Sequence, residues 1–215
     1  VLDMIGFDDL DGDGCSEFLV GGVDGASGVT RGFVAVISGR TGSVLRTSFD
    51  EVRGDLIGMP LAIVGDMDRD GVRDYATSNY WGGSGRGEVI LVYSGATGAI
   101  IRRWIRQGYD FATALIGGMD ADLDGFPDVI AGSFSYVNPG PVGRGRAQVF
   151  SARDEQLLMF TTPGTSYQSN FWGYYAAEFA NLGVQPGNPY PVFVLPYHFQ
   201  VPGNPEVLRL QAWRC

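Results

Sequence analysis

The chain has 215 residues, 33 of them glycine, and a formal net charge of −9. It is long enough for one substantial core, and abundant Val, Ile, Phe and Tyr between glycines favour short strands joined by turns. No apolar run reaches the ~20 residues that a membrane helix needs, and no basic stripe points to a nucleic-acid partner. Because Val1 is not an initiator Met and no leader-like segment precedes it, we expect a mature form, a fragment or the ordered part of a longer protein.

The acidic residues are concentrated in three nine-residue segments that share one internal pattern. Each segment has carboxylates at positions 1, 3, 5 and 9 and a glycine at position 6. The segments hold twelve of the 24 acidic residues, and the 15 basic residues outnumber the twelve acids that remain elsewhere, so the acidity is local. The carboxylates are, in chain order, Asp9, Asp11, Asp13 and Glu17; Asp66, Asp68, Asp70 and Asp74; and Asp120, Asp122, Asp124 and Asp128.

Alternate carboxylates around a sharp glycine turn can converge on one point, and hard oxygens in a flexible shell suit Ca²⁺. Without a cation, four carboxylates held this close would repel one another. A solvated acidic loop is the simpler alternative, but the repetition argues against it. An EF-hand would need a bidentate Glu at position 12, where this chain has Val20, Thr77 and Ala131. We therefore expect hairpin loops that bind about three Ca²⁺ ions, with the ninth carboxylate closing each shell.

The acidic segments recur with a period that predicts repeated sheets of four strands. Successive segments begin 57 and 54 residues apart. Asn181 begins a fourth segment, in which Gly183, Gln185 and Pro189 occupy the other ligand positions, so we expect no Ca²⁺ there. A strand follows each segment and runs into a Gly-, Ser- or Pro-rich connection. The expected third strands are residues 32–37, 88–93, 146–150 and 206–210, and the expected fourth strands are residues 44–48, 100–105 and 157–161.

Four antiparallel strands per repeat of about 55 residues describe a propeller blade, and stacked blades bury both faces of each sheet. We therefore expect an all-β fold: a single β-propeller domain of about four four-stranded blades, with an incomplete last blade. A β-sandwich of the same hairpins is the alternative, but it does not explain why the acidic loop keeps one place in every repeat. The expected blades are residues 1–54, 55–108, 109–168 and 169–215.

A second, weaker pattern precedes the acidic segments. Ile57-Gly58, Phe111-Ala112 and Trp172-Gly173 each stand nine residues before a segment or its remnant. Together with the acidic loops, this pattern resembles FG-GAP repeats, which form the β-propeller of integrin α-subunits and many bacterial surface proteins. The resemblance covers essentially the whole chain. It implies that a main-chain carbonyl at position 7 joins the carboxylates around each Ca²⁺ ion. Those carbonyls belong to Cys15, Val72 and Phe126.

The blade number departs from the family, which closes with more blades than this chain holds. Either a small four-bladed ring closes, or the chain is part of a larger ring. In a four-bladed ring, blade four lies beside blade one, and Cys15 and Cys215 both lie toward the calcium-loop face. A disulfide between them would then lock the ring in a compartment outside the cytosol; two unpaired thiols are the alternative. Neither cysteine belongs to a CxxC motif or a Cys/His cluster, so we do not expect zinc.

We expect a non-catalytic domain, stabilised by calcium, that binds a protein or glycan partner at the cell exterior or in the periplasm. A subunit of a larger surface or periplasmic assembly fits equally well. Aromatic and Arg residues on loops opposite the calcium face would form the binding surface, unless they pack within their own loops. They are Tyr80, Trp81, Arg86, Tyr136, Arg144 and His198, the last in a loop-like setting.

The sequence carries no motif for nucleophilic or phosphoryl-transfer catalysis. It has no Gly-x-Ser-x-Gly elbow, no His-Glu pair and no phosphate loop, and His198 is its one histidine. We therefore expect no enzyme. A glycan-active propeller, a polysaccharide lyase or hydrolase that uses a carboxylate pair, is the alternative.

Overall fold

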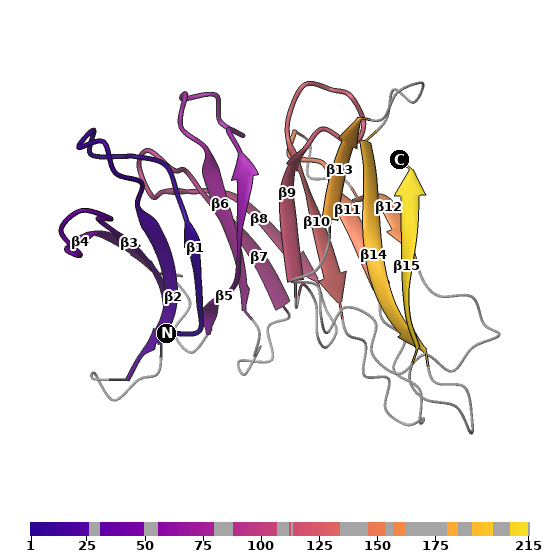
Figure 1. Cartoon of the computed structure of the whole chain (residues 1–215), viewed down its shortest axis with the longest axis horizontal. Coiled ribbons are helices and arrows are strands. Elements are labelled where there is room, and N and C mark those ends of the chain that lie inside the picture. The colour runs from indigo at the N-terminus through magenta and orange to yellow at the C-terminus, as the bar shows by residue number, and fades with distance from the viewer. Residues whose placement is uncertain are drawn as a thin grey trace. The chain divides into compact units, whose positions relative to one another are not determined.

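The computed structural model of the chain consists of β-sheets throughout its described residues. These are residues 1–25, 31–49, 56–79, 88–106, 112, 114–133, 146–153, 157–161, 180–184, 191–199 and 207–214. Every regular element among them is a strand (Figure 1). The chain divides into two compact units, residues 1–108 and 109–215, which we describe in turn.

The first unit contains two four-stranded antiparallel sheets. In each sheet, every strand pairs with the next one along the chain, so both sheets are simple meanders. The first sheet comprises β1 (Asp3–Gly6), β2 (Phe18–Asp24), β3 (Arg31–Ile37) and β4 (Val44–Phe49). The second comprises β5 (Ile57–Gly65), β6 (Asp74–Asn79), β7 (Glu88–Tyr93) and β8 (Ile100–Arg106).

The described residues of the second unit form one sheet of four strands and one of three, again with sequential antiparallel pairing. These sheets and those of the first unit confirm the predicted all-β fold of antiparallel propeller blades, and within the described residues the last blade is incomplete, with three strands. The four-stranded sheet comprises β9 (Ala114–Met119), β10 (Asp128–Ser133), β11 (Arg146–Phe150) and β12 (Leu157–Thr161). The other comprises β13 (Ala180–Val184), β14 (Pro191–Phe199) and β15 (Val207–Arg214).

The core of the first unit lies between its two sheets, where β1, β2 and β3 contact β5. The buried ring of Tyr75 lies at the centre of this core. It packs edge to face against Phe7, with 5.7 Å between the ring centroids, and stacks on Tyr93, with 5.4 Å between the centroids. The strands approach closely where β2 crosses β5. A Cβ atom on Gly21 would lie only 1.7 Å from the carbonyl oxygen of Gly58, so this contact requires glycine.

The last sheet corrects one expectation from the sequence. His198 does not lie in a loop: it belongs to β14, where it pairs with Leu208 of β15. The neighbouring Tyr197 and Phe199 are strand formers, and the pairing with β15 continues to Phe199, which lies opposite Val207. The fourth acidic remnant also differs from the other loops, because its first residue, Asn181, is already part of β13.

Candidate metal centres

Each of the three acidic segments connects the first two strands of a sheet. The segments follow β1, β5 and β9 and lead into β2, β6 and β10. Their position-6 glycines, Gly14, Gly71 and Gly125, have φ values of 86°, 92° and 86°. A residue with a Cβ atom rarely adopts this left-handed conformation. The glycine therefore reverses the chain sharply between two antiparallel strands, as the sequence predicted.

The position-1 carboxylate organises each loop by accepting backbone amides from residues further along it. In the second loop, Asp66 Oδ1 accepts the amide of Asp70 at 3.1 Å and Oδ2 accepts the amide of Gly71 at 3.0 Å. Asp9 and Asp120 accept the equivalent amides at 2.8–3.1 Å. This local bonding is what short Asp side chains offer in turns, and it folds the loop around its first ligand position.

The carboxylates at positions 3 and 5 are held in the same way, each through one oxygen. Asp68 Oδ1 accepts the amide of Asp70 at 3.2 Å, and Asp70 Oδ1 accepts the amide of Val72 at 2.9 Å. The first and third loops repeat both bonds at 2.8–3.2 Å. One oxygen of each carboxylate thus fixes the loop.

The position-9 carboxylates are buried and tie the loop to a second turn of the same sheet. Asp74 Oδ2 accepts the amide of Met67 at 2.6 Å, and Oδ1 accepts the amide of Gly95, in the turn between β7 and β8, at 2.9 Å. Asp128 makes the equivalent bonds at 2.7 and 3.1 Å. The carboxylates could be predicted from the sequence pattern, but these turn amides could not, because nothing in the local sequence relates them to the loop.

Glu17, the position-9 residue of the first loop, differs in one informative way. Its Oε2 accepts the amide of Leu10 at 2.8 Å. Its Oε1 is buried and has no hydrogen-bond partner among the described residues. A buried carboxylate oxygen without a partner is costly, and a bound cation would satisfy it. The donor set of hard oxygens therefore fits a metal such as Ca²⁺.

Three groups of carboxylates in the described part of the chain could hold a metal ion. Within each group, one oxygen from every residue lies within 4.8 Å of the others. The groups are Asp9, Asp11 and Asp13; Asp66, Asp68 and Asp70; and Asp120, Asp122 and Asp128. Position 9 thus joins the group directly in the third loop, whereas position 5 does so in the first two.

Burial and mutual repulsion disfavour the ionised forms of Asp74 and Asp128 when no metal is bound. Burial raises the pKa of Asp74 to about 6; its two amide bonds lower it in part, and the charges of Asp68 and Asp70 raise it again. Burial raises the pKa of Asp128 to about 7, with further repulsion from Asp122 and Asp124. A divalent cation would offset these unfavourable terms.

Arg46 links the first sheet to the turn that holds Asp74. From β4 it donates to the carbonyl oxygens of Gly95 at 2.7 Å and Ala96 at 2.8 Å. The amide of Gly95 binds Asp74, so the same turn joins the acidic loop of the second sheet to the outer strand of the first. The contact between Arg46 and Gly95 could not be predicted from the sequence either, since it joins residues 49 positions apart.

The other predicted site residues are placed as follows. Tyr80, Trp81, Arg86, Tyr136 and Arg144 lie outside the described residues, and His198 lies in β14. Cys15 is half-buried and forms no disulfide within the described residues. Cys215 lies outside them, so the proposed bond stays a prediction. The carbonyls of Cys15, Val72 and Phe126 also remain predicted ligands.

A search of the described residues finds no helix with the length and apolar character needed to cross a bilayer. No model of a known protein family matches the chain.

Sequence comparison relates the chain to integrin α-subunits. Human integrin alpha-IIb is 33% identical over 109 residues, which cover 47% of this chain and 10% of that protein. Integrin alpha-PS2 of Drosophila melanogaster is 28% identical over 180 residues, 70% of this chain and 13% of that protein. Chicken integrin alpha-V is 33% identical over 87 residues, 36% of this chain and 8% of that protein. The chain thus spans only about a tenth of the length of these relatives. These similarities confirm the predicted resemblance to integrin α-subunits and their FG-GAP-type repeats.

Proposed function

We propose that the chain is a calcium-stabilised β-propeller domain that binds a partner outside the cytosol and catalyses no reaction. The observation that carries the calcium assignment is the repeated acidic loop, whose position-9 carboxylate is buried in all three copies. In the first copy, Glu17 Oε1 lacks a hydrogen-bond partner among the described residues. A divalent cation supplies the positive charge that such a cluster needs in order to stay folded and ionised.

The ligands of each ion would be the carboxylates at positions 1, 3, 5 and 9 with the carbonyl at position 7. The metal has a structural role in this proposal: it neutralises the loop and adds its binding free energy to folding. We further propose that residues 1–215 form one propeller domain. One cooperative transition in calorimetry of the Ca²⁺-loaded chain would support a single domain, and two independent transitions would contradict it.

The partner proposal rests on the similarity to integrin α-subunits, which are cell-surface proteins. It favours a protein partner over a glycan. Cross-linking on intact cells, in Ca²⁺ and again in EGTA, tests this: we expect one defined protein neighbour whose capture depends on Ca²⁺. Selective binding to a glycan array with no protein neighbour would contradict it.

The calcium proposal is tested by calorimetric titration of the EGTA-treated chain, followed by thermal melts with and without Ca²⁺. We expect about three binding sites and a large rise in melting temperature on adding metal. Asp68→Asn should weaken binding at one site and leave the other two unchanged. An unchanged melting curve in excess EGTA, together with no heat of binding, would overturn the calcium assignment.

A further inference from the structure

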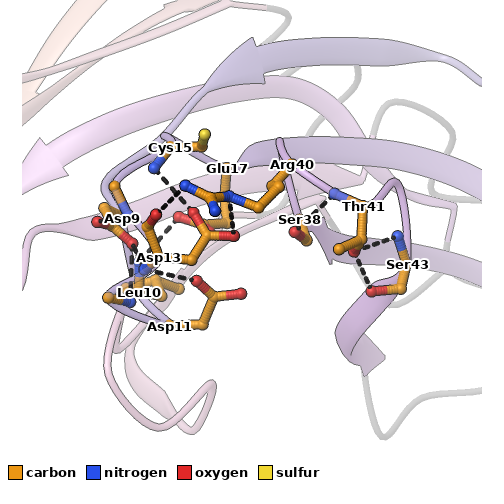
Figure 2. A network of polar contacts seen from close by, with 12 residues as sticks. Asp9, Leu10, Asp11, Asp13, Cys15, Glu17, Ser38, Arg40, Thr41 and Ser43 are labelled. Carbon is orange, nitrogen blue, oxygen red and sulfur yellow. Dashed lines mark hydrogen bonds and ion pairs between the residues drawn. The ribbon is translucent and has the colours of Figure 1, made fainter.

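An arginine is paired with one of the predicted ligands of the first acidic loop. Arg40 lies in the turn between β3 and β4. Its Nε lies 3.3 Å from Asp13 Oδ2, and a terminal nitrogen donates to the main-chain oxygen of Asp13. Figure 2 shows the guanidinium reaching toward the loop from the turn that also holds Ser38, Thr41 and Ser43.

The guanidinium occupies the oxygen that a cation would use. Asp13 Oδ1 is already fixed by the amide of Cys15 at 2.8 Å, so Oδ2 is the oxygen left free to bind metal. Arg40 pairs with Oδ2. The Arg40 side chain is 57% exposed and that of Asp13 is 21% exposed, so Arg40 can swing into solvent, whereas Asp13 stays in the loop.

The second loop provides the comparison. Its position-5 carboxylate, Asp70, is also fixed at Oδ1 by a backbone amide, but its Oδ2 receives the neutral hydroxyl of Ser94 at 3.2 Å. The turn residue that corresponds to Arg40 is Ala96.

We propose that Arg40 is a built-in competitor that weakens calcium binding at the first loop. The inference rests on the proposed calcium sites. A cation that approaches Asp13 must displace the guanidinium or bind beside its positive charge, and either route reduces affinity. In the metal-free protein, the same arginine partly neutralises the loop and keeps it folded.

Reciprocal substitutions test the proposal by calcium titration calorimetry. Arg40→Ala should tighten Ca²⁺ binding at the first loop by about three- to tenfold. The matched change Ala96→Arg, at an exposed position, should weaken Ca²⁺ binding at the second loop by a similar factor. Asp11→Asn identifies the binding step of the first loop, because it should abolish that step, and adding Arg40→Ala to that variant should then change nothing.

A second measurement separates competition from a merely structural role. In EGTA, Arg40→Ala should lower the melting temperature slightly, although the same variant binds Ca²⁺ more tightly. Unchanged or weaker Ca²⁺ binding in Arg40→Ala would overturn the inference; weaker binding would mean that Arg40 orients the ligand. If the unmodified chain binds no Ca²⁺, the proposal of calcium sites is itself contradicted. If the chain binds Ca²⁺ but Arg40→Ala does not change the affinity, only the proposed role of Arg40 is contradicted.

Discussion

Arg73, at the end of the second acidic loop, donates from Nε to both carboxylate oxygens of Asp8, each at 3.0 Å. Asp8 directly precedes the first loop, so this pair joins the two sheets of the first unit at their acidic ends. The hydrogen bond from Arg73 lowers the pKa of Asp8, and Asp8 in turn raises the pKa of Arg73. Sequence spacing gives no sign of the pair, because 65 residues separate its members.

Removing this pair should cost little and should depend on salt. Arg73→Ala and Asp8→Asn should each lower the free energy of unfolding by about 0.5–1 kcal/mol, the range of partly exposed ion pairs. Because the pKa of Asp8 is lowered, its contribution is present above the ordinary pKa of 3.8 and is lost as the pH falls further. A double-mutant cycle in urea should show coupling that disappears in about 1 M salt. Salt-independent coupling would contradict this account.

The buried carboxyls of Asp74 and Asp128 predict an opposite pH dependence when metal is absent. Their pKa values are raised from 3.8 to about 6 and about 7. The folded chain therefore holds protons that the unfolded chain releases, and stability that is full below about pH 4 is lost as the pH rises toward about 7. In EGTA, the melting temperature should fall between about pH 5 and about pH 8.

Bound Ca²⁺ should remove this fall, because it stabilises the ionised carboxylates. Melts with saturating Ca²⁺ over the same pH range provide the comparison. The variant Asp74→Asn, which cannot ionise, should show a smaller fall in EGTA than the unmodified chain. A melting temperature in EGTA that is flat or rises over this window would contradict the assigned roles of both carboxyls.

The parts of the fold that depend on local pattern could be predicted from the sequence. The third strand was expected at residues 88–93 and 146–150, and β7 and β11 have these bounds. Apolar runs bounded by glycine turns specify such strands locally. The acidic loops were predicted for the same reason, since the spacing of their carboxylates and the position-6 glycine are properties of nine consecutive residues.

The parts that depend on distant neighbours could not be predicted. The amide of Gly95 reaches Asp74 from 21 residues away, and Arg46 reaches the carbonyl of Gly95 from 49 residues away. The first contact forms only when the four strands of the second sheet assemble, and the second only when the two sheets pack together. The prediction that His198 lies in a loop was also wrong. Its strand, β14, is specified by pairing with β15 and not by an alternating pattern of its own.

Close packing between the first two sheets predicts that Gly21 tolerates no side chain. Gly21→Ala would place a methyl group 1.7 Å from the carbonyl oxygen of Gly58, and a backbone atom cannot swing aside as the end of a flexible side chain can. We expect a loss of about 3 kcal/mol or more in the free energy of unfolding. Gly25→Ala is the matched control, because an added Cβ meets nothing within 4 Å there. Equal effects of the two substitutions would contradict the close approach of β2 and β5.

Substitutions of Asp74 and Asp68 should distinguish a carboxylate that the second loop needs to fold from one that it needs only to bind metal. Asp74→Ala leaves the amides of Met67 and Gly95 without an acceptor, so the metal-free domain should lose about 2–5 kcal/mol. Asp68 is exposed and contributes one bond to the amide of Asp70, which the Oδ1 of an asparagine can replace. Asp68→Asn should therefore leave the melting temperature in EGTA within a few degrees, since its effect on stability is at most about 0.5 kcal/mol. Both variants should weaken Ca²⁺ binding at this loop. If Asp68→Asn destabilised the metal-free domain as much as Asp74→Ala, then the proposed difference between Asp68, which serves only as a ligand, and Asp74, which also holds the loop together, would be wrong.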